Sequence, residues 1–137
     1  MAAYTKFHAF VEALAEKVHN LGSDQLTLAL TNTAPTASTN AVLADITQIS
    51  YTNLSSRNVT TSSSAQTAGT YKLTLADLVL TASGGSVAAF RYVVLYNSTA
   101  AAGNLIGYYD YGSSLTLADT ETLTVDFDGS AGALTLA

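Results

Sequence analysis

The chain has 137 residues, a formal net charge of −5 and no cysteine, and charged residues fill only 11% of its positions. This length is typical of one domain, so we expect residues 1–137 to form a single domain. The absence of cysteine excludes disulfides, thiolate catalysis and cysteine-ligated zinc. The five basic residues are scattered, and an acidic surface repels phosphate backbones, so nucleic acid is not an expected partner. The low charge density favours a chain that packs against other protein over a freely diffusing enzyme.

The sequence shows no targeting or membrane signal. No apolar run approaches the roughly 20 residues that a membrane-spanning helix needs. Acids and two histidines interrupt the first 20 residues, so these cannot serve as the apolar core of a signal peptide. We therefore expect neither a membrane partner nor secretion.

The first predicted element is an amphipathic α-helix over residues 4–21. Its large apolar residues recur every three or four positions on one stripe, and Gly22 is a natural stop. The stripe consists of Tyr4, Phe7, Val11, Leu14, Val18 and Leu21. Such a stripe covers something apolar, either the domain's own sheet or a partner chain, and both interpretations stay open.

After Gly22 the apolar period changes to two, which predicts a mainly β fold. About eight short strands separated by polar turns favour a β-sandwich over residues 25–137, of jelly-roll or Greek-key type. Residues 87–97 are apolar on both faces and should form a central strand that is buried on both sides. We expect further strands at 26–31, 42–51, 71–75, 78–80, 105–111, 115–117, 123–127 and 133–136, with a break at 76–77. Residues 33–40 and 52–69 are expected to be loops, the second one long and exposed, with an edge strand at 59–64 as the alternative.

The sequence offers little for chemistry. On a helix, His8 and His19 would lie about 16 Å apart, too far for one metal ion, and we expect both on a solvated helix face. Asp126 and Asp128 flank Phe127, and their carboxylates are ligands of the type that calcium takes. Their spacing matches no calcium-binding loop, so we expect both side chains to face water. No serine or histidine lies in a hydrolase or zinc-protease motif. We expect no enzyme activity, no catalytic residue, no cofactor and no bound metal.

The candidate site residues are those suited to protein contact. Tyrosine joins a large apolar body to a polar tip, which suits interfaces and the edges of a core alike, and both interpretations stay open for the tyrosines of residues 105–111. The candidates for a protein interface are Tyr4, Phe7, Val11, Leu14 and Val18 on the helix stripe, Arg57 in the polar loop, and Tyr108, Tyr109 and Tyr111 on a strong strand.

Four segments resemble, in their sequence and in their order, small structural proteins encoded among the head genes of tailed bacteriophages. These segments are YTKFHAFVEALAEKVHNLGSDQLTLALTNTAP, VLADITQISY, TLADLVLTASGGSVAAFRYVVLYN and LIGYYDYGSSLTLADTETLTVDFD. Proteins of this kind look like capsid cement or decoration proteins, several of them compact β domains that act as dimers or trimers. The resemblance implies a structural virion protein made in the host bacterial cytoplasm and located on the capsid exterior. Its implied partners are the phage major capsid protein and further copies of itself.

Two other functions stay open. One is a phage tail, baseplate or head-fibre module, with a binding role toward a glycan through exposed tyrosines. The other is a secreted adhesin-like β domain, against which the missing signal peptide argues. The resemblance brings no functional residues that can be transferred position by position.

Overall fold

A computed structural model describes residues 2–137 and shows a mainly β protein with antiparallel sheets and one α-helix in that range. A five-stranded sheet has the order β1-β8-β7-β2-β3, a three-stranded sheet the order β10-β5-β4, and β6 pairs with β9. The elements are β1 (Ala3–Lys6), α1 (His8–Ala15), β2 (Leu26–Thr31), a 3-10 turn (Leu43–Asp45), β3 (Asn58–Val59), β4 (Thr61–Thr67), β5 (Thr70–Leu75), β6 (Leu78–Thr81), β7 (Phe90–Asn97), β8 (Leu105–Leu115), β9 (Thr122–Val125) and β10 (Leu134–Leu136).

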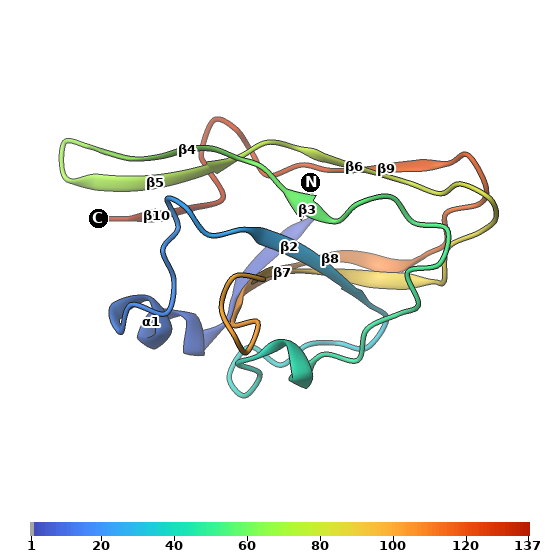
Figure 1. Ribbon diagram of the computed structural model, residues 1–137, viewed down its shortest axis with the longest axis horizontal. Coiled ribbons are helices and arrows are strands. Elements are labelled where there is room, and N and C mark those ends of the chain that lie inside the picture. The colour runs from blue at the N-terminus through green and yellow to red at the C-terminus, as the bar shows by residue number, and fades with distance from the viewer. Residues whose placement is uncertain (1) are drawn as a thin grey trace.

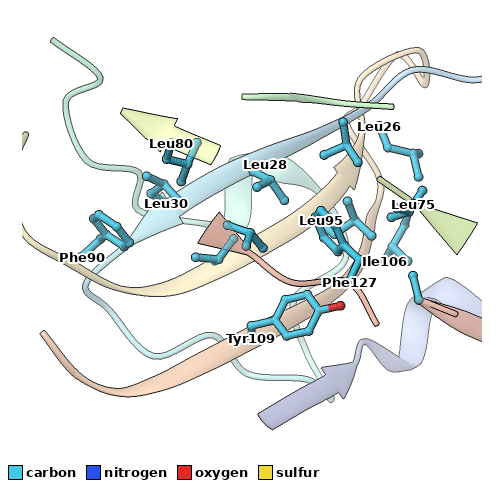
Figure 2. Close-up of a cluster of buried hydrophobic side chains, with 14 of the residues drawn as sticks. Leu26, Leu28, Leu30, Leu75, Leu80, Phe90, Leu95, Ile106, Tyr109 and Phe127 are labelled. Atoms are coloured by element: carbon cyan, nitrogen blue, oxygen red, sulfur yellow. The ribbon is translucent and has the colours of Figure 1, made fainter. Parts of the chain in front are cut away.

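The main hydrophobic core lies between the five-stranded sheet and the two smaller sheets. Figure 1 shows β4, β5, β6 and β9 along one side of the molecule, with β2, β7 and β8 beneath them. Side chains from both sides meet in one cluster (Figure 2), to which β2 gives Leu28, β7 gives Leu95, β5 gives Leu75 and β6 gives Leu80. Phe127, just after β9, is also fully buried there. This shared core fixes the smaller sheets on the larger one.

The opposite face of the five-stranded sheet is also covered. A second cluster joins Val94 of β7 and Leu105 of β8 to Phe7 and to Ile46 of the long segment between β2 and β3. Val93 belongs to the main core, so β7 buries side chains on both faces. This confirms the prediction of a central strand, which starts at Phe90, since residues 87–89 lie outside it.

The predicted helix over residues 4–21 is wrong at both ends. Residues 3–6 form β1, in which Ala3 lies opposite Asp110 and Lys6 opposite Gly107 of β8. The edge of β8 offers main-chain groups that an adjacent segment satisfies only when it is extended, and this pairing overrides the helical spacing of the side chains. At its other end α1 stops at Ala15, and Lys17 then adopts a left-handed conformation with φ 68°.

Three further expectations meet different outcomes. Residues 42–51 are not a strand: they hold the 3-10 turn, where the backbone N–H groups of Ala41 and Val42 donate to Asp45 and hold the pKa of its carboxyl below its usual range. The stretch at 59–64 is divided between two sheets: Val59 is buried in β3, whereas residues 61–64 belong to the hairpin of β4 and β5. This hairpin has a register shift between Thr61 and Ser63 and is closed by Ala68 and Gly69 with positive φ. The break at 76–77 is confirmed, because β5 and β6 belong to different sheets.

Candidate functional site

Several of the predicted interface residues lie in the interior. Phe7 is fully buried and Tyr109 nearly so, so neither presents a surface to a partner. The Tyr4 and Tyr109 rings pack with centroids 5.1 Å apart, and Tyr109 meets Phe127 edge-on at 5.9 Å. Burial raises the pKa of Tyr4 to about 12 and also raises the pKa of Tyr109. These tyrosines therefore stay un-ionised and belong to the edge of the core; Tyr108 and Tyr111 are half-buried.

Arg57 closes the edge of β2. Its guanidinium lies 3.6 Å from the centroid of the Tyr51 ring, and its Nη1 donates to the Leu28 carbonyl at 2.5 Å. The Tyr51 hydroxyl accepts from the Leu30 backbone N–H at 3.0 Å and donates to Gln48 Oε1 at 2.6 Å. Side chains thus satisfy the main chain of β2 beyond the short strand β3, which gives Arg57 a structural task within its own chain.

Leu14 and Val18 remain candidates because they line a groove. The groove has a volume of about 610 Å³. It lies between α1 and the turn after it, the strands β4, β5 and β10, and the loop after β7. Of its lining residues, only these two were predicted to lie at a protein interface. Its lining consists of Leu14, Lys17, Val18, His19, Asn20, Leu21, Gly22, Asp24, Ser64, Tyr71, Thr99, Ala100 and Leu136.

His19 is a buried polar residue of this groove, and Asn97 determines its tautomer. Asn97 Oδ1 accepts backbone N–H groups from Thr99 at 2.9 Å and Ala100 at 3.2 Å, so Asn97 Nδ2 is the donor end of the amide. Nδ2 donates to Asp24 Oδ2 at 2.6 Å and lies 3.1 Å from His19 Nδ1. Because Nδ1 must then accept, the proton of the neutral ring is on Nε2.

The prediction of a solvated helix face is wrong for His19. The residue lies beyond the end of α1, is only 5% exposed, and its ring packs against Phe10 at 5.1 Å between centroids. Burial lowers the pKa of His19, and the charge of Asp24 opposes this in part. Within residues 2–137, Nε2 has no hydrogen-bond partner. Among the described residues, His19 therefore keeps an uncharged donor without an acceptor inside the protein.

Asp126 and Asp128, near the C-terminus, accept hydrogen bonds from the backbone of their own turn. Asp126 Oδ1 accepts from the Asp128 N–H at 2.8 Å, and Asp128 Oδ1 accepts from the N–H groups of Ser130 at 3.2 Å and Ala131 at 3.0 Å. In the part of the chain that the structure describes, no three His, Asp or Glu side chains gather as a metal site requires.

A charged pair also joins β7 to β8. Arg91 donates twice to Asp110, from Nε at 2.8 Å and from Nη2 at 3.0 Å. This guanidinium, with a further hydrogen bond from the Gly112 N–H, holds the pKa of the Asp110 carboxyl below its usual range. Both side chains are about one-third exposed, so this ion pair between the two strands lies at the surface. It therefore contributes little to the free energy of unfolding.

No protein-family model, curated protein or solved structure matches the chain. Across residues 2–137, no helix is both long and apolar enough to cross a membrane.

Proposed function

We propose that the chain is a structural virion protein of the capsid cement or decoration type, which binds the assembled phage head through the rim of the groove. The observation that carries this proposal is the distribution of exposed large apolar side chains. In residues 2–137 these are Val11, Val18, Val79 and Leu136, at 53%, 39%, 49% and 50% exposure. Val18 and Leu136 line the groove, and Val11 lies one turn from Leu14 on α1. Three of the four thus gather at one end, where a protein partner would cover them.

A β-sandwich scaffold is part of the same proposal. The core shared by the five-stranded sheet and the smaller sheets supports two packed layers. The pairing of β1 with β8, and of β2 with β7, joins strands that are distant in sequence, which supports connections of the Greek-key kind. Such a scaffold suits a cement protein, which needs a rigid adhesive surface and no active site.

A cement protein stabilises the capsid by thermodynamic linkage between its own binding and the assembly of the lattice. A protein that binds the assembled lattice and not its free subunits stabilises the lattice by mass action. Particles that carry the chain should therefore release their DNA at a higher temperature than particles without it. The rim is mostly apolar, so the shift should be nearly equal at low and high salt.

The test compares thermal DNA release from the two kinds of particle at both salt concentrations. Equal release temperatures would remove the cementing function. A shift that disappears at high salt would leave the function in place and refute the apolar rim as the contact.

The alternative function is a tail, baseplate or head-fibre module with a glycan-binding role. The copy number in purified virions distinguishes it from a cement protein. A cement protein is present in proportion to the capsid subunits, and a tail module in a few copies per virion.

A further inference from the structure

The strand β4 forms the longest open sheet edge of residues 2–137. It has seven residues, whereas the other edge strands in that range have two to four. One side of β4 pairs with β5, and no strand among the described residues pairs with the other side. Six of its seven residues are exposed, and Figure 1 shows its hairpin reaching one end of the molecule. A further strand has free access to this edge.

The turn of this hairpin determines which main-chain groups face outward. A two-residue turn at 68–69 has positive φ at both positions, and Thr67 lies opposite Thr70. Residues that flank such a turn hydrogen-bond to each other, and hydrogen-bonded and non-hydrogen-bonded pairs then alternate along the two strands. Gln66 and Ser64 are accordingly the residues whose main-chain N–H and C=O groups point away from β5. Within residues 2–137 these groups have no main-chain partner.

The side chains of β4 place no charge against an incoming strand. The strand contains only Thr, Ser, Ala and Gln, and it lacks the lysine or proline that commonly protects a sheet edge. Lys72 is the one charged residue of β4 and β5, although the chain as a whole has a net charge of −5. Two copies of this acidic chain that approach through their hairpins therefore bring no carboxylates together.

The same properties indicate which strand fits this edge. Because β4 is exposed on both faces, a strand added to it also has both faces in water and must be polar on each. A strand that is apolar on one face would leave that face uncovered. β4 itself meets the requirement, and two identical antiparallel strands are related by a two-fold axis, the commonest symmetry of dimers. The edge therefore favours a second copy of this chain as its partner.

We propose that two copies of the chain associate through antiparallel pairing of their β4 strands, centred on Ala65. Ser64 of each copy then lies opposite Gln66 of the other copy, and each such pair exchanges both of its main-chain hydrogen bonds. The register shift between Thr61 and Ser63 limits regular pairing to the rest of β4. The contact joins the two three-stranded sheets into one continuous sheet. It involves no phage head, so its test is independent of the proposed function.

The test measures self-association of the purified chain by sedimentation equilibrium, at concentrations up to about 1 mM because the interface is small. Gln66→Pro removes an outward N–H without breaking a hydrogen bond between β4 and β5, and we expect it to weaken dimerisation by about tenfold or more. Gln66→Ala is the matched control. It removes the same side chain, which accepts the Gly69 N–H, but keeps the outward N–H, so dimerisation should stay within about twofold of wild type.

Two outcomes of this measurement would overturn the proposal. One is a wild-type chain that stays monomeric over the whole concentration range. The other is a Gln66→Pro variant that dimerises as well as Gln66→Ala, because the outward N–H would then take no part in the contact. Position 66 is exposed at a sheet edge, so both variants should fold, and thermal melting checks that they do.

The register of the pairing has a test of its own, because the chain contains no cysteine. In the proposed dimer the two Ala65 residues oppose each other as a non-hydrogen-bonded pair, the closer of the two kinds, so Ala65→Cys should form an intermolecular disulfide on mild oxidation. The two Thr67 residues would lie about 14 Å apart along the strands, so the equally exposed control Thr67→Cys should cross-link at least about tenfold more slowly. Cross-linking of Thr67→Cys as fast as that of Ala65→Cys would overturn the proposed pairing.

Discussion

Phe7 and Val11 belong to the same apolar stripe in the sequence, yet the structure predicts opposite results for their truncation. Phe7 is fully buried: its ring lies 5.3 Å from that of Tyr108, and its cluster includes Val94 and Leu105. Phe7→Ala should therefore leave a cavity and lower the free energy of unfolding by about 3–5 kcal/mol. Val11 is 53% exposed, so Val11→Ala should change it by less than about 0.5 kcal/mol.

The melting temperature makes this difference easy to measure. An unfolding entropy of about 2.1 cal/mol/K per residue, over 137 residues, gives roughly 0.3 kcal/mol per degree. Phe7→Ala should then lower Tm by roughly 10–17 °C, and Val11→Ala by no more than about 2 °C. Circular dichroism melts, supported by urea titrations, provide the assay. A loss below about 1 kcal/mol for Phe7→Ala would refute the placement of this side chain in the core and restore it to the surface.

Three other variants test the core, the buried histidine and the edge of β2. Val94→Asp should abolish soluble folding, because an unpaired buried carboxylate costs several kcal/mol, and a soluble variant that melts cooperatively would contradict its burial. Burial lowers the pKa of His19 from 6.5, so the unfolded chain takes up more protons; the free energy of unfolding should be highest above about pH 6.5 and fall below it. His19→Gln should flatten that decline in pH-dependent urea titrations, whereas the exposed control His8→Gln should retain it. Tyr51→Phe leaves the Leu30 N–H unpaired and should cost about 1–3 kcal/mol in the same titrations, and no change would show that this N–H finds another partner.

The candidate site was only partly predictable. The apolar spacing identified Leu14 and Val18, which line the groove, but it also selected Phe7, which is buried. The reason is that periodicity reports a shared face only while the chain remains one helix, and here the chain is extended at residues 3–6 and turns after residue 16. His19, Tyr71 and Leu136 were missed, because no local pattern shows that a helix end, a hairpin and the last strand meet.

Some features were determined by the sequence alone because they depend on near neighbours. Alternating apolar residues predict β2 and β9, and the two-sided run at residues 87–97 predicts the buried strand β7. The change of parity at 76–77 predicts the break between β5 and β6. For β7, the side-chain pattern within a few residues already specifies that both faces must leave water. For β2, the alternation predicts the strand but only one buried face, whereas all six of its residues are buried.

Tertiary structure decided the features that depend on partners far away in the chain. Residues 3–6 are a strand because the edge of β8, about a hundred residues later, supplies their hydrogen bonds. His19 is neutral because the tertiary structure buries it and so lowers its pKa, and its Nδ1 accepts a hydrogen bond from Asn97, 78 residues away. A local pattern contains the propensity of a segment but not the position of its partner. Where helix propensity conflicts with pairing to a distant segment, the pairing prevails, because unpaired main-chain groups and buried donors cost more free energy than helix propensity offers.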